Sequence, residues 1–256
     1  MKILKFKKQS KDKYKLYLDN NSDITLYEDV IIKNNLLITK EISDELLEAL
    51  KKQNNDMYAY TLALGYISVK MRSIKEINDY LIKKGFNNLV ANKVSERLIK
   101  EGYLNDLKYT KSFICDSMNL TNKGPQKIKM ELIKYGVNKD IIESEIALID
   151  QRKVEEKLNK LIDKELKIKK GSQNAIKIKI INHFVNLGYS KDLVTSILTG
   201  KEITSDKSKL KKDYEKLYNK YKVKYNGQEL LYFISQKLYS KGYTASDIKE
   251  VLKEEN

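Results

Sequence analysis

Four copies of one spaced pattern of apolar residues and glycine run along this chain. In each copy an isoleucine is followed after four residues by a large apolar residue and after eight by a glycine, and a Phe, Val or Tyr comes next. The copies are Ile77, Leu81, Gly85 and Phe86; Ile128, Leu132, Gly136 and Val137; Ile180, Phe184, Gly188 and Tyr189; and Ile234, Leu238, Gly242 and Tyr243. The glycines lie 51, 52 and 54 residues apart, and a period near fifty residues indicates an array of repeats.

Each copy predicts the end of a helix. Apolar residues four positions apart share one helix face, and a glycine after the last turn adopts the left-handed conformation that closes a helix. A second apolar pattern at helical spacing follows each glycine, and a longer amphipathic stretch precedes each copy. We therefore predict units of three helices, in which the middle helix ends at the glycine and the next residue folds back onto its apolar face.

The N-terminal forty residues follow a different pattern. Apolar and polar residues alternate over 14–18, which is the period of a β-strand, and residues 3–7 and 24–27 are expected to supply neighbouring strands. A short helix is predicted over 28–35. Ser43 then has the features of an N-cap, since two acidic residues and a helical apolar pattern follow it.

Composition agrees with a helical protein. The 256 residues include 10 glycines and 1 proline, too few turn residues for a β-sandwich or barrel. The predicted fold class is mainly α: an elongated tandem array of four three-helix, helix-turn-helix-like repeats with a small β-containing N-terminal segment. The expected boundaries are 1–54 for the sheet segment and its linking helix, then 55–105, 106–150, 151–204 and 205–256 for the repeats.

Local signals place individual helix ends and side chains. Ser73 and Glu76 have the spacing of a capping box, and Pro125 suits the first turn of a helix. Asp106 is predicted to be the N-cap of the first helix of the second repeat. Cys115, the one cysteine, excludes an intramolecular disulfide and is expected to pack as a small apolar residue.

Residue types that carry enzyme chemistry are sparse. One cysteine and one histidine, His183, cannot make a metal site of three or four ligands, and no glycine-rich phosphate loop occurs. Acidic residues are interleaved with lysines at helical spacing, which is typical of surface ion pairs. We expect a protein that is not an enzyme and binds no cofactor or metal. No stretch is long enough to cross a membrane, so a soluble, cytoplasmic monomer is expected.

The charge favours a polyanionic partner. Lys and Arg number 50 against 35 acidic residues, a net charge of +15. Residues 151–225 hold 20 basic and 9 acidic residues, a net charge of +11. Such an excess attracts phosphate, and it serves solubility equally well. The middle helices carry lysines off their apolar faces, and Lys123 precedes a helix N-terminus whose free amides favour an anion.

Three groups of residues between 56 and 150 resemble the RecX family, the regulators of the RecA recombinase. They are Arg72-Ser73 with Glu76 and 81–86; 101–106 with Tyr109 and Phe113; and Lys123-Gly124-Pro125 with Ile128, Glu131-Leu132 and Gly136-Val137. Their combination in this order and spacing is specific. The strand-rich N-terminus and the repeats beyond residue 150 resemble the long form of the family.

The resemblance implies a regulator that lies along the RecA filament on single-stranded DNA. There it would inhibit ATP hydrolysis and strand exchange in recombination, DNA repair and the SOS response, with weak, sequence-tolerant DNA binding. Arg72 is among the few matches to the family's arginine-rich surface, and Lys123, Lys127 and Lys129 cluster where the match is strongest. The candidate residues for contact with the filament or nucleic acid are Arg72, Lys75, Lys83, Lys84, Lys123, Lys127, Lys129, Lys134, Lys177 and Lys179.

Two other classes of function fit the pattern. A helix pair joined at Gly85 resembles a helix-turn-helix, whose following helix would place Asn92, Lys93 and Arg97 in the major groove of duplex DNA. A helical-repeat scaffold without nucleic-acid contact is the other class. The first predicts strong discrimination among duplex sequences, and the second predicts no salt-dependent binding to single strands.

Overall fold

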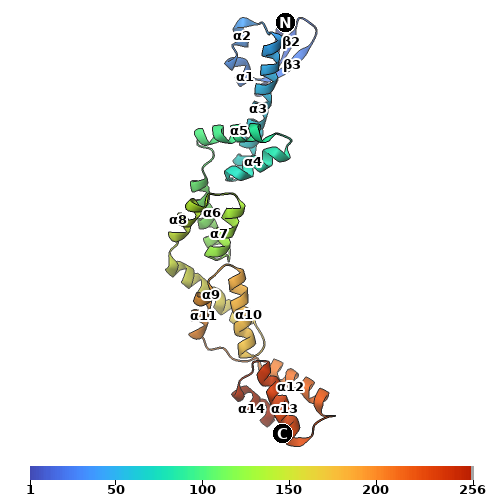
Figure 1. Ribbon diagram of the computed structural model, residues 1–256, viewed down its shortest axis with the longest axis vertical. Helices are drawn as coiled ribbons and strands as arrows, with labels where there is room; N and C mark the ends of the chain where they lie inside the picture. The colour runs from blue at the N-terminus through green and yellow to red at the C-terminus, as the bar shows by residue number, and fades with distance from the viewer. Residues whose placement is uncertain (255–256) are drawn as a thin grey trace. The chain divides into compact units, whose positions relative to one another are not determined.

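Each copy of the apolar and glycine pattern forms a helix in the computed structural model of the protein, which describes residues 1–254 (Figure 1). The middle helices of the repeats are α4 (Ile74–Lys83), α7 (Pro125–Lys134), α10 (Gln173–Asn186) and α13 (Gly227–Ser240). The glycine after each has a positive φ, from 77° at Gly136 to 94° at Gly85. The residue that follows each glycine is buried. The predicted helix ends are therefore confirmed.

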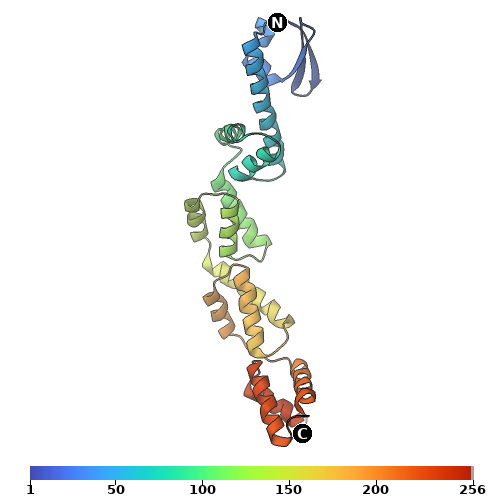
Figure 2. The same ribbon diagram turned by 45° about the vertical axis from the view of Figure 1, so that its right-hand side comes forward.

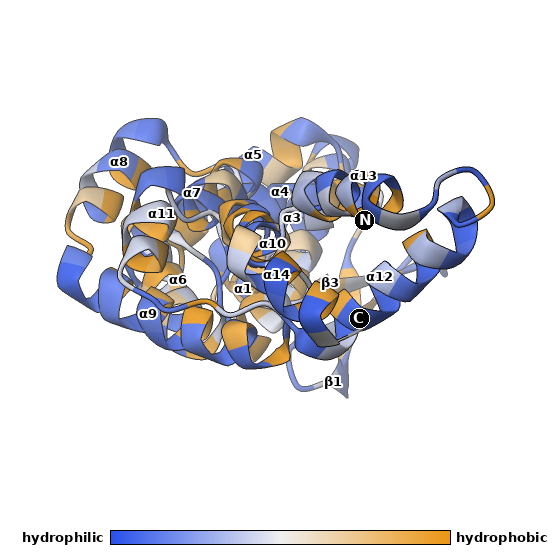
Figure 3. Cartoon of the chain, turned by 90° about the horizontal axis from the view of Figure 1, so that it is seen from below, coloured by the Kyte–Doolittle hydropathy of each residue, from blue (hydrophilic) through white to orange (hydrophobic). Residues whose placement is uncertain are grey.

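A first and a third helix flank each middle helix. The third helices are α5 (Asn88–Lys100), α8 (Lys139–Ala147), α11 (Lys191–Thr199) and α14 (Ala245–Glu254). The first helices of the second, third and fourth repeats are α6 (Asp106–Leu120), α9 (Gln151–Ile168) and α12 (Lys207–Tyr221). Figure 3 shows both hydrophobic and hydrophilic positions along α9. This order confirms the mainly α, three-helix-repeat class. The predicted end of the fourth repeat, Glu255 and Asn256, lies outside the described residues.

A three-stranded antiparallel sheet begins the chain, with the strand order β1-β2-β3 (Figure 2). Its strands are β1 (Ile3–Ser10), β2 (Lys13–Leu18) and β3 (Asp23–Tyr27), and two short helices follow, α1 (Glu28–Lys33) and α2 (Leu36–Thr39). The strands confirm the expectation from alternation, and β1 runs three residues further because it pairs with β2 as far as Ser10 and Lys13. The helix α2 was not expected.

The helix α3 (Asp44–Val69) crosses the expected boundary between residues 54 and 55 without a break. The Ser43 hydroxyl accepts a hydrogen bond from the Leu46 amide, which confirms this N-cap. The Asn54 side chain accepts from the Tyr27 amide at 2.9 Å and donates to the Thr25 carbonyl at 3.0 Å. One side chain of α3 thus satisfies two backbone groups of β3, and the helix also serves as the first helix of repeat 1.

The chain forms two compact units, and each is described by itself. The first holds Met1–Lys111 and Ile133–Ile141, and the second holds Ser112–Leu132 and the chain from Ile142 onward. In the first unit one core lies between the sheet and the start of α3, and another lies among α3, α4 and α5. In the second unit the third and fourth repeats each have a core of their own. Burial of these apolar faces stabilises each repeat.

The N-terminus of α4 has a capping box, as predicted. The Ser73 hydroxyl accepts from the Glu76 amide while the Glu76 carboxylate accepts from the Ser73 amide. The prediction for Asp106 is wrong, because Asn105 accepts from the Lys108 amide and caps α6 instead. The Asp106 carboxylate accepts from the Ile74 amide at 3.0 Å. It therefore caps α4, a helix that begins 32 residues earlier in the sequence.

Successive middle helices meet end to end inside the units. The Ser73 hydroxyl, before α4, donates to the Tyr135 carbonyl at the end of α7 (2.7 Å). The Gly124 amide, before α7, donates to the Leu187 carbonyl at the end of α10 (2.7 Å). Ser172, before α10, repeats the contact with the carbonyl of Lys241 at the end of α13 (2.6 Å). In each joint a helix N-terminus meets a helix C-terminus, so that their opposite partial charges attract.

The glycines of these joints lie too close to the neighbouring helix for any side chain. A Cβ on Gly188 would lie 2.3 Å from the Lys127 backbone nitrogen, and one on Gly136 would lie 2.6 Å from the Lys75 side chain. Gly85 has open space instead, since no further middle helix meets it. Glycine is therefore needed at Gly85 for its backbone conformation alone, and at the joints for close approach as well.

Cys115 is exposed, and its sulfur accepts a hydrogen bond from the side-chain amide of Asn119 at 3.3 Å, so the prediction that it packs in a core is wrong. It lies on the outer face of α6, beside the buried Ile114. Across residues 1–254 no helix is long and apolar enough to cross a membrane, and no group of three metal-binding side chains occurs.

Candidate polyanion-binding site

Four of the candidate lysines surround one cavity in the first unit. Lys75, Lys83 and Lys84 come from α4 and its C-terminal turn, and Lys134 comes from the end of α7. All four are exposed, and the cavity they line has a volume of about 650 Å³. We call it the repeat-1 cavity; it is lined by Tyr66, Lys75, Glu76, Asp79, Tyr80, Lys83, Lys84, Lys134 and Tyr135.

An aromatic stack supports this cavity. The rings of Tyr66 on α3 and Tyr80 on α4 are stacked, with centroids 4.1 Å apart and planes 10° apart. The Arg72 guanidinium lies 3.8 Å from the Tyr66 centroid and pairs with the Glu76 carboxylate at 3.2 Å. Only 12% of the Arg72 side chain is exposed, so it fixes the stack and presents little of its surface to a partner.

Cations outnumber carboxylates around the cavity. Glu76 is held by Arg72 and by the Ser73 amide, and burial together with Glu76 raises the pKa of Tyr109 above its usual range. Lys75 donates to the Lys134 carbonyl at 3.2 Å, and the Lys84 ammonium lies 5.6 Å from the Tyr80 centroid. Four ammonium groups therefore meet two carboxylates, of which one is already bound. Such a site suits phosphate groups or an acidic protein surface.

The lysines near Pro125 are placed differently. Lys123 pairs with Glu131 at 2.5 Å, and Lys129 pairs with Glu143 at 3.1 Å. Lys127 is exposed, and its backbone forms the joint with Gly188. The expectation of free amides at this helix N-terminus is wrong, because Gly124 and Gln126 donate to the carbonyls of Leu187 and Gly188.

The candidates on α10 do not join the repeat-1 cavity. Lys177 is half-buried, whereas Lys179 is exposed and donates to the Lys170 carbonyl at 3.4 Å. The described structure therefore brings together four of the ten candidate residues, places Arg72 beneath them, and leaves the other five on α7, α10 and the turn before α7.

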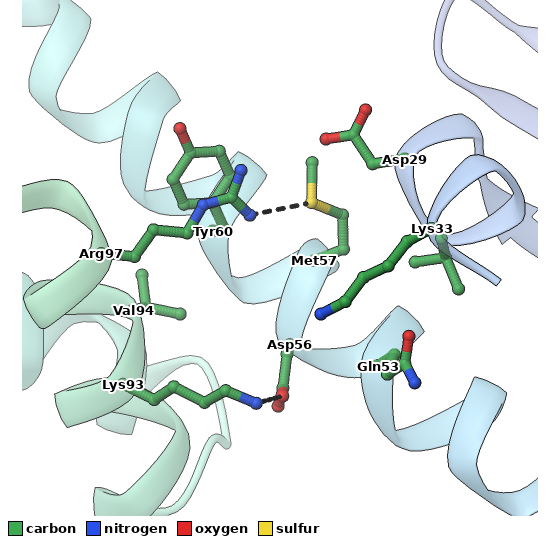
Figure 4. A pocket seen from close by; sticks show the side chains of 10 residues that line it. Asp29, Lys33, Gln53, Asp56, Met57, Tyr60, Lys93, Val94 and Arg97 are labelled. Carbon is green, nitrogen blue, oxygen red and sulfur yellow. Dashed lines mark hydrogen bonds and ion pairs between the residues drawn. The ribbon is translucent and has the colours of Figure 1, made fainter. Parts of the chain in front are cut away.

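Several polar side chains of α5, the helix expected to read duplex DNA, are engaged, and Figure 4 shows Lys93 and Arg97 among them. Lys93 pairs with Asp56 of α3, and the Arg97 guanidinium lies 3.8 Å from the Tyr60 centroid and binds Glu101. Asn92 accepts a hydrogen bond from Asn78. Burial and the bond to Glu101 raise the pKa of Tyr60 to about 12. These contacts hold α5 against α3 and offer few free donors for base edges.

The stack of Tyr66 on Tyr80 does not follow from the repeated pattern. Tyr66 and Tyr80 lie on different helices, and neither belongs to the repeated pattern. A signal was present in the rarity of arginine, since two of the three arginines cover a tyrosine ring, Arg72 on Tyr66 and Arg97 on Tyr60. Arginine stacks on aromatic faces better than lysine does, which suits it to these two positions.

Known proteins resemble the chain over its full length. Family models described as the first and the second three-helix domain of RecX match residues 59–98 and 105–144. The regulatory protein RecX of Streptococcus uberis is 36% identical over 259 residues, 99% of each chain, and that of Streptococcus agalactiae serotype V is 33% identical, again over 99% of each.

Two solved structures share the fold. The crystal structure of a regulatory protein RecX has a TM-score of 0.69 and 22% identity, and it covers 77% of this chain and 98% of its own. The crystal structure of RecX from Lactobacillus salivarius has a TM-score of 0.53 and 27% identity, over 57% of this chain and 96% of its own.

Proposed function

Because this chain belongs to the RecX family of regulatory proteins, we propose that it binds the filament of the RecA recombinase on single-stranded DNA and inhibits it. The inhibited activities are ATP hydrolysis and strand exchange, and the setting is recombination and DNA repair in the cytoplasm. The protein acts as a monomer and forms or breaks no covalent bond. Full-length identity of 36% to a named regulatory protein is the observation that carries this proposal.

The repeat-1 cavity is the proposed contact with the filament. Its four exposed lysines stand on a rigid base, because the stacked rings of Tyr66 and Tyr80 hold α4 against α3. Ammonium groups fixed in this way lose little freedom on binding, so more of their attraction for phosphates or carboxylates appears as affinity. The binding should weaken as salt rises.

The repeats supply further contacts of the same kind. Lys127 and Lys179 are exposed on the middle helices of the second and third repeats. Several weak contacts on one chain add by multivalency when their spacing matches that of the partner. Lys123, Lys127 and Lys129 remain a proposed second contact, to be tested after the cavity, because two of the three are already paired with glutamates.

A titration of the full-length protein into a RecA and single-stranded DNA ATPase assay tests this function. The variant has all four cavity lysines replaced: Lys75→Gln, Lys83→Gln, Lys84→Gln and Lys134→Gln. The matched control removes the same charge from four exposed lysines of β1 and the turn after it: Lys5→Gln, Lys7→Gln, Lys8→Gln and Lys11→Gln. Circular dichroism verifies that both are folded.

The wild type and the control should inhibit ATP hydrolysis, and the cavity variant should need roughly tenfold more protein for the same inhibition, in keeping with several lost ionic contacts. Equal inhibition by both variants would remove the cavity from the proposal. A wild type that leaves ATP hydrolysis, strand exchange and filament binding unchanged would contradict the function itself.

A further inference from the structure

The turn between α12 and α13 carries an aromatic cluster that the repeat-1 cavity does not include. The Tyr225 ring is stacked on Phe233, with centroids 4.8 Å apart and planes 22° apart. Tyr221 meets Phe233 edge to face at 4.7 Å. All three rings are half-buried. They form a platform, defined here as the 221/225/233 platform, whose rings are neither enclosed in a core nor fully exposed.

The backbone of the turn fixes this platform. The amides of Lys224 and Tyr225 both donate to the Tyr221 carbonyl, at 2.9 and 3.1 Å. The turn therefore closes directly after Tyr221, the last residue of α12. It brings the Tyr225 ring back beside α13. Val223 lies at the tip of the turn and is 87% exposed. An apolar side chain so exposed beside ordered aromatic rings is available to a partner.

Lysines surround the platform without acidic partners. Lys220, Lys222 and Lys224 alternate with Tyr221, Val223 and Tyr225, and Lys237 lies over Phe233 with its ammonium 5.1 Å from the centroid. Within residues 1–254 none of these four lysines forms an ion pair with a carboxylate. The acidic residues nearest in sequence are Glu215 and Glu229. The turn therefore has a local positive charge that no neighbouring side chain cancels.

Stacked aromatic side chains surrounded by cationic side chains are the features that bind unpaired bases. A base stacks on an aromatic face whatever its identity, and nearby lysines bind the flanking phosphates. Duplex bases are stacked on one another and do not offer their faces. We propose that the 221/225/233 platform binds single-stranded nucleic acid, with a base on the Tyr225 face and phosphates on Lys222 and Lys224.

This inference deepens the proposed function, since it rests on single-stranded DNA as a partner and names a site for it. The site lies in the last repeat, and its residues 221–225 are the C-terminal end of the most basic part of the chain, 151–225. An anionic membrane is the other surface that a turn of lysine, tyrosine and valine fits. The test therefore includes vesicles, and no recombinase, so that its outcome is separate from that of the ATPase assay.

The absence of tryptophan from the chain gives a direct readout. In the full-length variant Tyr225→Trp the indole is the one tryptophan, and a base stacked on it quenches its fluorescence. The control is Tyr232→Trp, because Tyr232 is 68% exposed on α13 and, in the described part of the chain, forms no aromatic stacking or edge contact with the platform rings. The probe is a thirty-nucleotide oligothymidine, with its duplex and vesicles containing phosphatidylserine as competitors.

The Tyr225→Trp indole should be quenched by the oligothymidine and much less by the duplex, whereas the Tyr232→Trp indole should not respond. Tyr225→Leu should weaken oligothymidine binding about tenfold without changing the salt dependence. Lys222→Gln with Lys224→Gln should lower the slope of log affinity against log salt by about 1.4.

Equal quenching of the two indoles, or none in either, would overturn the proposal. So would binding to duplex or vesicles as tight as binding to the single strand. If Tyr225→Leu loses oligothymidine binding but still inhibits ATP hydrolysis fully, the platform is the site for the single strand. The repeat-1 cavity then remains the proposed contact with the recombinase. If Tyr225→Leu does not fold, as judged by circular dichroism, the quenching of Tyr225→Trp decides the question alone.

Discussion

The hydroxyl of Ser73 donates a 2.7 Å hydrogen bond to the backbone carbonyl of Tyr135, 62 residues further along the chain. The same oxygen accepts a bond from the Glu76 amide, so one buried side chain satisfies the start of α4 and the end of α7. Ser172 has the same two roles between α10 and α13. A residue that sequence alone identifies as a helix cap therefore also connects one repeat to the next.

Replacing Ser73 should lower the free energy of unfolding by more than the loss of an ordinary N-cap does. In Ser73→Ala the Tyr135 carbonyl and the first amides of α4 both lose a partner, and we expect a loss of roughly 2 to 3 kcal/mol in the free energy of unfolding. Ser43→Ala is the matched control, since Ser43 is an exposed cap whose hydroxyl bonds to Leu46 and Glu45 of its own helix, and it should cost about 1 kcal/mol. Urea unfolding followed by circular dichroism measures both. Equal losses would mean that the joint contributes nothing.

The glycines of the repeated pattern should differ in their tolerance of alanine. Gly85→Ala meets only the strain of a positive φ in open space, about 1 to 2 kcal/mol. Gly188→Ala adds a clash with the Lys127 backbone, so a loss of roughly 3 kcal/mol or more is expected. Thermal unfolding of the two variants ranks them. A Gly188→Ala protein as stable as Gly85→Ala would contradict the close approach of the two helices.

The fourth repeat should lose stability in acid through Asp213. Burial raises the pKa of this carboxyl, but bonds donated by Lys241 and Tyr243, both at 2.9 Å, outweigh burial and lower it overall. A carboxyl with a lowered folded pKa stabilises the protein above its unfolded pKa, near 3.8, and that contribution is lost as pH falls through the folded value.

Asp213→Asn measures this contribution. At pH 7 the variant should be less stable by roughly 2 kcal/mol, because two bonds to a charged acceptor are weakened, and the difference should shrink towards pH 3. Asp12→Asn, at an exposed position in the turn between β1 and β2, is the control and should change little. Urea unfolding midpoints measured at several pH values test the prediction. A difference in stability between the wild type and Asp213→Asn that stays constant from pH 3 to pH 7 would contradict it.

Asn54→Leu should separate the sheet from α3. The leucine leaves the Tyr27 amide and the Thr25 carbonyl without their partner, and we expect a loss of roughly 2 to 3 kcal/mol. Hydrogen exchange read by mass spectrometry should show faster exchange in β3 while α12 to α14 stay unchanged. Exchange that is unaltered in β3 would show that apolar packing alone holds the sheet.

Local signals in the sequence predicted the elements that depend on neighbours in the chain. The glycine-closed helices, the capping box at Ser73 and the alternating strands each arise from contacts within a few residues. The partner of Asp106 lies 32 residues away, and the glutamates that neutralise Lys123 and Lys129 lie 8 and 14 residues away. A periodic pattern contains no information about such pairs. The same limit applies to the stack of Tyr66 on Tyr80.

The continuity of α3 across residues 51–56 was also not predicted from the sequence. Residues 51–56 are polar, and the expected boundary between residues 54 and 55 falls within this break in the apolar pattern. Polar side chains alone do not end a helix, and no proline or glycine lies between Ser43 and Gly65. The break marks the place where the helix passes from one core to the next.

One helix thus belongs to two cores. Leu50 is buried with the sheet, and Ala59 and Ala63 are buried with α4 and α5, along a helix of 26 residues that spans about 39 Å. Helix formation is cooperative, so loss of either core would fray turns that support the other. The sheet and the first repeat should therefore open as a single foldon, and the amides of residues 51–56, far from both ends of the helix, should be among its last to exchange.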